Sequence, residues 1–340
     1  MQAGETVREV IASQAAAWDR VVGTAPRRWP VAGRVLCVGS GTSYYLAQVV
    51  AALGRKRGRE MRACPTQDII LEPAEALKAV DAVVIISRSG ETSEALWSAE
   101  IARQAGKLTL GVTCTEAAPL AARVDEVWSL PFAHDHTVVM VRSFTTMLLA
   151  FEWALAHAVG DTAGVQALQA LVQAAPAFIG QAETQLAPLF ATRPRRVYIL
   201  GAGVRYGVAL EGALKCGEMS TECAAAYGPL EFRHGPWGSV TPEDVVVVLG
   251  QTALAHHEHP VLHDVAARTG RVLTIAAPAF FSGLAPHGAR CVLPPVAEAW
   301  AGPLAVVPLQ WLGYHWALSG GRNPDTPPNL TPVVDLTYGP

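Results

Sequence analysis

Two segments of the chain read almost alike. Residues 34–47 (RVLCVGSGTSYYLA) and 196–209 (RVYILGAGVRYGVA) share six identical positions, including both glycines of a Gly-x-Gly. Each begins with an apolar run, turns at the glycines and continues into a helix-forming stretch, which is typical of a strand–loop–helix unit. Further apolar runs follow at matching places, in 82–86 with 245–249 and in 105–112 with 269–276. The sequence therefore predicts an internal duplication.

Strands that are apolar throughout and alternate with helices indicate parallel sheets covered on both faces. With 340 residues there is room for two domains. We therefore expect an α/β fold of two tandem, doubly wound parallel-sheet (αβα) domains, at about residues 33–165 and 194–320. The other segments are expected to form an N-terminal helix (1–32), a connecting helix (166–193) and an extended, packed C-terminal tail (321–340).

Composition indicates a compact globular protein, because 51% of the residues are apolar and 16% are charged. The net charge of −3 gives no reason to expect a nucleic acid or a membrane surface as a partner. Six cysteines without CxxC spacing suggest reduced core residues in a cytoplasmic protein. No signal-peptide pattern opens the chain. Its longest apolar run, about 300–318, contains prolines, Gln310 and His315, and we expect it to form a buried core helix.

The first Gly-x-Gly loop carries the hydroxyl residues Ser40, Thr42 and Ser43 around Gly41. It lacks the third glycine of a dinucleotide fingerprint, and the next strand does not end in the usual acidic residue. A nicotinamide is therefore disfavoured, and no cofactor is expected. In the second copy the glycines are interpreted as a structural turn.

A second hydroxyl-rich loop, SRSGETSE (87–94), follows the apolar run 82–86. Both loops lie at the carboxyl ends of predicted parallel strands, where open α/β sheets bind ligands. Hydroxyls, helix-start N–H groups and an arginine suit a phosphate dianion. The matching segment of the second copy, GQTALAHHE (250–258), lacks this pattern. Phosphate binding is therefore favoured, with an ordinary polar turn as the alternative.

The second copy carries a different polar pattern. Glu211, Lys215 and Glu218 are spaced to share one helix face among apolar neighbours, and His234 follows in the loop EFRHGP. A carboxylate held beside a cation, followed by a histidine in a loop, suits general acid–base chemistry. The alternative is an i,i+4 helix pair and an unrelated loop histidine.

Several motifs in the same order resemble the sugar isomerase (SIS) superfamily: GSGTSY, SRSGETSE, the run 208–236 and VPLQWLGYHWAL (307–318). The similarity is greatest to the isomerase half of glutamine–fructose-6-phosphate amidotransferase and to stand-alone enzymes that isomerise or deaminate hexosamine 6-phosphates. The resemblance implies two SIS-type, flavodoxin-like domains, each with a five-stranded parallel sheet, and usually a homodimer.

The resemblance also implies roles for single residues. It places the phosphate on Ser43, Ser87, Ser89 and Thr92, with Arg88 beside them where the family commonly has glutamine, and Asp135 near the sugar. It implies that Glu218 shuttles the proton, that His234 opens the ring of the neighbouring subunit's substrate, and that Lys215 orders the pocket.

Two departures narrow the expected reaction. Pro332 stands where the amidotransferase has an imine-forming lysine, and no glutaminase domain with an N-terminal cysteine is present. We therefore expect a hexose or hexosamine 6-phosphate isomerase or deaminase that works through an enediol or enolamine and does not use glutamine. The alternatives are a non-catalytic phosphosugar sensor and a sugar–amine deglycase.

Two histidine-rich segments, HDH (134–136) and HHEHPVLH (256–263), invite a metal hypothesis. Pro260 is expected to break a helix in the second, and no cysteine accompanies the histidines. We therefore expect solvated surface loops and no metal.

Overall fold

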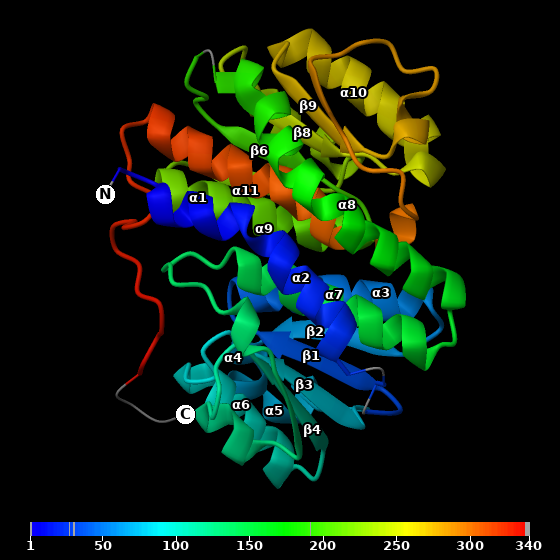
Figure 1. Ribbon diagram of the computed structural model, residues 1–340, viewed down its shortest axis with the longest axis vertical. Helices are drawn as coiled ribbons and strands as arrows, with labels where there is room; N and C mark the ends of the chain where they lie inside the picture. The colour runs from blue at the N-terminus through cyan, green and yellow to red at the C-terminus, as the bar shows by residue number, and fades with distance from the viewer. Residues whose placement is uncertain (1, 27, 30, 191, 337–340) are drawn as a thin grey trace. The chain divides into compact units, whose positions relative to one another are not determined.

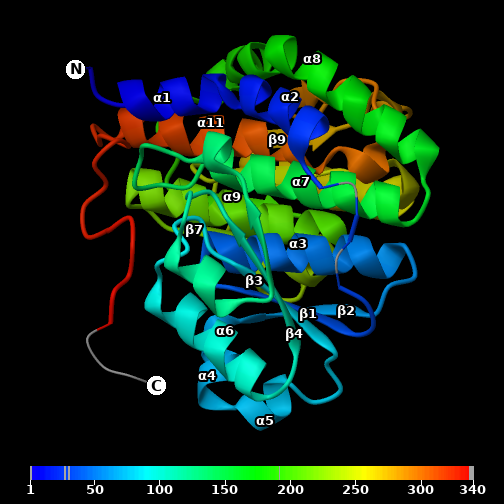
Figure 2. The same cartoon turned by 60° about the horizontal axis from the view of Figure 1, so that its bottom comes forward.

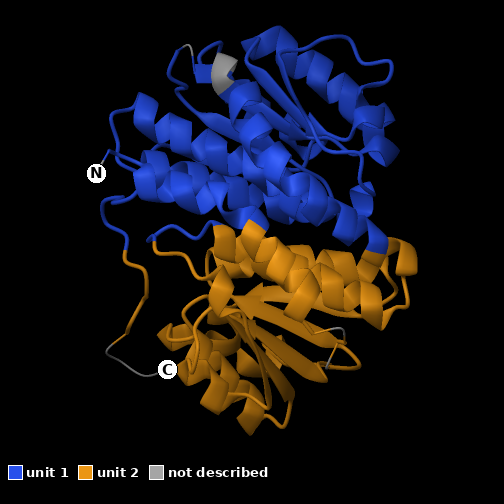
Figure 3. Cartoon of the chain, in the orientation of Figure 1, with its two compact units in different colours: residues 1–15, 137–141, 166–330 blue, residues 16–136, 142–165, 331–340 orange. Residues whose placement is uncertain are grey.

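The computed structural model describes residues 2–26, 28–29, 31–190 and 192–336. These form two compact units, shown in Figure 3. Unit 1 comprises residues 1–15, 137–141 and 166–330, and unit 2 comprises residues 16–136, 142–165 and 331–340. Each unit contains one five-stranded sheet, and every strand pair in both sheets is parallel.

The sheet of unit 2 has the strand order β2-β1-β3-β4-β5. The central strands β1 and β3 are buried at every position, as their continuous apolar sequences predict. The edge strands β2 and β5 are partly exposed and mix polar with apolar residues. The strand bounds are β1 Val35–Gly39, β2 Met61–Pro65, β3 Ala82–Ile86, β4 Leu108–Thr113 and β5 Glu126–Ser129.

Helices cover both faces of this sheet. α3 and α7 pack together on one face, and α4 and α6 pack together on the other (Figures 1 and 2). Small residues of α6, among them Ala95, Ala99 and Ala102, pack in one apolar cluster with side chains from β1 and β3. The helix bounds are α2 Gln14–Thr24, α3 Thr42–Lys56, α4 Thr66–Leu71, α5 Pro73–Ala76, α6 Ser93–Gln104 and α7 Arg142–Ala158.

The sheet of unit 1 has the order β10-β9-β8-β6-β7, which repeats the first sheet when strands are matched in chain order. Both follow the flavodoxin-like pattern, in which the strand order reverses beside the first strand. The predicted fold class is therefore confirmed. The strand bounds are β6 Val197–Leu200, β7 Ala224–Tyr227, β8 Val245–Leu249, β9 Val272–Ala276 and β10 Ala289–Val292.

In unit 1, α11 runs beside α9, while α10 packs on β8 and β9 (Figure 1). The predicted core helix is α11, which is buried almost throughout. Its polar Gln310 accepts a hydrogen bond from Gln14 (2.8 Å) and donates one to the carbonyl of Val141 (3.0 Å), so burial leaves its amide satisfied. The helix bounds are α1 Glu5–Ala12, α8 Thr162–Leu186, α9 Val204–Ser220, α10 Ala255–Thr269 and α11 Gly302–Ser319. No helix within the described ranges is long and apolar enough to cross a membrane.

The two Gly-x-Gly turns have almost the same backbone. Gly41 has φ 53° and ψ −124°, and Gly203 has φ 57° and ψ −121°. A Cβ on the first glycine of each motif would be too close to the helix start: on Gly39 it would lie 2.5 Å from the backbone of Ser43, and on Gly201 it would lie 2.4 Å from that of Arg205. Both copies therefore need their glycines for the turn itself, and any functional difference must come from the residues around them.

Three predictions need correction. The N-terminal stretch forms two helices, α1 and α2, separated at Ser13. Pro260 does not break a helix but lies inside α10, so the segment 256–263 is helical and not a loop. Pro260 removes one helical hydrogen bond and crowds the preceding turn, and the apolar contacts of Val261, Leu262 and Val265 offset this cost by holding the helix against the sheet. All six cysteines are free, but Cys223 is exposed and not part of the core.

Candidate active site

In unit 2 the two hydroxyl-rich loops follow neighbouring strands. Residues 40–41 join β1 to α3, residues 87–92 join β3 to α6, and Val38 of β1 pairs with Ile85 of β3. Both loops therefore lie at the carboxyl edge of the sheet, at the point where the strand order reverses. This is the position at which doubly wound sheets bind their ligands.

The side chains of these loops are mostly buried but polar. Ser40 hydrogen-bonds to Thr66, the first residue of α4 (2.6 Å). Ser87 accepts a hydrogen bond from the N–H of Gly90 (3.1 Å), and Ser89 accepts one from that of Glu91 (3.2 Å). These bonds fix the loop shape, and hydroxyl oxygens retain further capacity to bind a ligand. The residues less than 10% exposed are Thr42, Ser43, Ser87, Arg88 and Ser89.

Arg88 is directed at the C-terminal tail. Its side chain is 6% exposed, and its Nη2 donates to the carbonyl oxygen of Pro332 (2.8 Å). Its own carbonyl accepts from Cys114 N–H (2.8 Å) and from the Thr113 hydroxyl (3.0 Å), so the backbone is tied to the end of β4. At least one donor of the guanidinium is thus engaged by the tail, while the predicted phosphate contact remains a prediction.

Asp135 caps α7. Its carboxylate, 2% exposed, accepts from the backbone N–H groups of Arg142 (2.9 Å) and Ser143 (3.3 Å) and from the Ser143 hydroxyl. These are the first two residues of α7, whose N–H groups have no partner within the helix. Capping α7 is therefore a structural role that explains why Asp135 is buried. Its predicted contact with the sugar remains a prediction.

In unit 1 the predicted trio of charged residues lies on one face of α9. The ammonium of Lys215 is 2.5 Å from the Glu218 carboxylate and 3.5 Å from that of Glu211. The side chains of Lys215 and Glu211 are 1% and 0% exposed, whereas that of Glu218 is 20% exposed. Two carboxylates therefore share one buried cation, and Glu218 is the member that reaches solvent.

His234 lies outside this trio, in an exposed position directly after the short 3-10 helix Glu231–Arg233. Its neighbour Arg233 forms an ion pair with Asp264, and Phe232 is fully buried. Phe232 and Arg233 thus anchor the two positions directly before His234, while His234 itself is exposed.

The second copy of the ligand edge is filled by its own charged side chains. Arg205, which matches Ser43, is 4% exposed and donates to the carbonyl of Ala301 (3.3 Å). Glu258, 2% exposed, accepts the N–H of Gln251, the residue that matches Arg88 (2.8 Å). Burial, with a smaller effect of Glu298, raises the pKa of Glu258 to about 7. The sequence interpretation missed this carboxylate, although a repeat alignment places it beside the lost loop.

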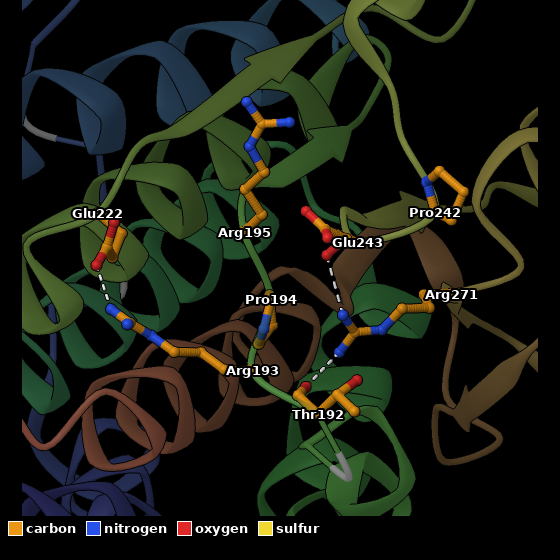
Figure 4. Close-up of a pocket in the computed structure, with 8 residues that line it drawn as sticks. All are labelled: Thr192, Arg193, Pro194, Arg195, Glu222, Pro242, Glu243 and Arg271. Atoms are coloured by element: carbon orange, nitrogen blue, oxygen red, sulfur yellow. Dashed lines mark hydrogen bonds and ion pairs between the residues drawn. The ribbon is translucent and has the colours of Figure 1, made fainter.

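A pocket of about 580 Å³ lies at the opposite, amino edge of the sheet of unit 1 (Figure 4). Its arginines are engaged by the protein: Arg193 pairs with Glu222, and Arg271 donates to the carbonyls of Glu243 and Thr192. Arg195 points away from both (Figure 4). None of the predicted site residues lines this pocket. Nor do the described residues include a group of three or more side chains placed to hold a metal ion.

Two parallel sheets of flavodoxin-like order, one of them with hydroxyl-rich loops at its switch point, define a tandem α/β protein of the sugar isomerase type. The chain belongs to the SIS domain family, whose model matches residues 31–158 and 191–284.

Three similar proteins illustrate the range of this family. The glutamine–fructose-6-phosphate aminotransferase (isomerizing) of Legionella pneumophila is 31% identical over 91% of this chain, which spans about half (52%) of that relative. The D-galactosamine-6-phosphate deaminase AgaS of Escherichia coli is 28% identical over 86% of this chain and 81% of its own length. The crystal structure of glucosamine-6-phosphate deaminase from Thermotoga maritima superposes with a TM-score of 0.85 at 24% identity, covering 98% of this chain and 100% of that one.

Proposed function

We propose that this protein is an enzyme that isomerises or deaminates a hexose or hexosamine 6-phosphate. The proposal assigns phosphate binding to Ser43, Ser87, Ser89 and Thr92, and proton transfer to Glu218. The names of the relatives support the substrate class, since one is an isomerizing glutamine–fructose-6-phosphate aminotransferase and another is a D-galactosamine-6-phosphate deaminase.

The observation that carries the proposal is that Glu218 is ion-paired to a buried lysine and is itself partly exposed. A buried Glu211–Lys215 pair would suffice for packing the helix. The same ammonium, however, also forms an ion pair with Glu218, which is partly exposed to solvent. A carboxylate held in place by a buried cation, with one side open, has the geometry that a proton shuttle requires.

In the proposed reaction, a proton from His234 helps to open the sugar ring and to expose the carbonyl carbon. Glu218 then removes the proton from C2 of the aldose, which gives an enediol, or an enolamine where C2 carries an amine. The same carboxyl group returns the proton to C1 to give the ketose or its imine. Water addition to that imine would release ammonia and leave the ketose 6-phosphate, so deamination needs no further reactant.

The main experiment separates binding from turnover. Wild-type protein is offered fructose, glucosamine, galactosamine and tagatose 6-phosphates in ²H₂O, with NMR detection of exchange at C1 and C2 and a parallel ammonia assay. Exchange with at least one sugar is expected, and its absence with all four would contradict an enzymatic function. Glu218→Gln should bind the same sugar but lose turnover by at least about a hundredfold. A sensor would show binding without exchange in both proteins.

The alternative of a deglycase acting on sugar–amine adducts makes a distinct prediction. Such an enzyme would convert a fructose–amine 6-phosphate adduct faster than glucosamine 6-phosphate, and it would still need Glu218. The same NMR assay with an added adduct therefore decides between the two reactions.

We further propose that the active form is a homodimer in which His234 serves the partner's site. The exposed position of His234 supports this arrangement. Glu218→Gln and His234→Asn proteins, each inactive alone, should regain up to about a quarter of wild-type activity when unfolded and refolded together, because half of the dimers would contain one intact site. Failure of the mixture to regain activity would show that each chain supplies its own histidine.

A further inference from the structure

Residues 332–336, which we call the strap, are hydrogen-bonded to the loop that follows β3 and to the start of α6. Arg88 Nη2 donates to the carbonyl of Pro332 (2.8 Å), and the Ser93 N–H donates to the carbonyl of Val334 (3.3 Å). The Ser93 hydroxyl donates to the Asp335 carboxylate (3.2 Å) and accepts from the N–H of Leu336 (3.0 Å). All these residues belong to unit 2, shown in orange in Figure 3.

The strap caps α6. The N-cap residue Thr92 makes no side-chain capping bond, and Ser93 is the first helical residue. The Ser93 N–H is one of the donors that a helix start leaves unpaired, and the strap supplies its acceptor. The strap also places the Asp335 carboxylate at this end of α6, where the helix dipole stabilises a negative charge.

The same helix start forms one end of the proposed phosphate loop. Ser87, Ser89 and Thr92 lie within six residues of Ser93, and the loop that carries them runs directly into α6. A bound phosphate dianion and the Asp335 carboxylate would therefore interact with the same positive end of one helix. Two negative charges at the same helix end repel each other, and since Asp335 is exposed, the repulsion is moderate and depends on salt.

We propose that Asp335 is an internal anion that opposes phosphate binding at the loop and so sets the affinity of the site for its substrate. This inference rests on the proposed function, since it takes the loop 87–92 as the phosphate site. Arg88 is the positioning residue of this arrangement. Its buried guanidinium holds Pro332, three residues before Asp335, and thereby keeps the carboxylate beside Ser93.

The test is the Asp335→Asn variant of the full chain. Asparagine keeps the side-chain oxygen that accepts from Ser93, so the strap retains its contact and only the charge is lost. Calorimetric titration with inorganic phosphate and with glucosamine 6-phosphate at low ionic strength should give dissociation constants about two- to fivefold lower than those of the wild type. The difference should nearly vanish in 0.5 M KCl, where the screening length falls to about 4 Å.

Two variants serve as controls. Asp335→Glu keeps the charge and should bind like the wild type. Glu100→Gln removes an exposed carboxylate from the far part of the same helix, where it pairs with Arg123, and should leave phosphate affinity unchanged. Equal or weaker binding by Asp335→Asn would overturn the inference and leave the proposed function intact. If neither wild type nor variant binds phosphate or the sugar phosphate, the inference and the proposed phosphate site both fail.

Discussion

The ammonium of Lys215 lies 2.5 Å from the Glu218 carboxylate, which the same helix places three residues further along the chain. Lys215 also pairs with Glu211, and these two side chains are buried, at 1% and 0% exposure. A buried charge that loses its partner is strongly destabilising, whereas an apolar replacement of a whole buried pair is tolerated.

Replacing Lys215 by methionine should therefore lower the free energy of unfolding by about 3–5 kcal/mol, because the buried Glu211 would lose its ion pair with Lys215. The double variant Lys215→Met/Glu211→Met should recover most of this loss. Urea denaturation at pH 7 measures both. Equal losses in the single and double variants would mean that packing, and not charge, determines the cost.

The matched glycines Gly41 and Gly203 offer a second prediction. Both have positive φ, so an alanine at either position should cost about 1–3 kcal/mol of stability through backbone strain. Only Gly41→Ala should also weaken phosphate binding, because only the first copy carries the hydroxyl-rich loop. Thermal unfolding and phosphate titration of the two variants provide the comparison. A similar loss of phosphate affinity in Gly203→Ala would contradict the assignment.

Glu258 predicts a pH dependence. The pKa of this buried carboxyl rises from 4.5 to about 7 in the folded protein, chiefly through burial. Between these values the folded state binds more protons than the unfolded state, so stability should fall as pH rises from about 4.5 to 7 and then level off. Glu258→Gln should lack this slope and be more stable than wild type at pH 8, by at most about 3 kcal/mol.

Urea unfolding of both proteins at pH 5 and at pH 8 measures this effect. Glu298→Gln is a useful companion, because Glu298 raises the pKa of Glu258 through its charge. A stability difference between wild type and Glu258→Gln that does not change with pH would show that Glu258 is ionised throughout.

Asp135 should behave as a helix cap. Removing its carboxylate leaves the N–H groups of Arg142 and Ser143 without their acceptor, so Asp135→Ala should lower stability by about 1–2 kcal/mol. Asp135→Asn, which can still accept one bond, should lose less. His136→Ala, at the exposed neighbouring position, should be close to wild type in the same denaturation experiment. No loss of stability in Asp135→Ala would leave its burial without an explanation.

The central strands could be predicted from the sequence because they are buried on both faces. The runs 82–86 and 245–249 contain only apolar residues, mostly β-branched, and their short length favours a strand buried on both faces. The edge strands β2, β5, β7 and β10 were not found from the residues, since they are partly exposed and show no distinctive pattern. Their number per sheet was expected from the family resemblance alone.

The candidate residues show the same division. The spacing of Glu211, Lys215 and Glu218 placed them on one helix face, because helix geometry is local. Which of the three remains accessible depends on the tertiary packing around α9, which leaves Glu211 and Lys215 buried and Glu218 20% exposed.

By itself, the sequence determined the two-domain α/β architecture, the glycine turns and the hydroxyl-rich loop, since each depends on a few neighbouring residues and on the apolar period of strands and helices. Only the tertiary structure decided that Arg88 holds Pro332, 244 positions away, that Asp135 caps a helix and that Pro260 lies within one. The physical reason is that a buried polar side chain must find a hydrogen-bond partner among the groups that the folded chain brings near it. These groups can come from segments distant in the sequence, so a local sequence pattern does not reveal them.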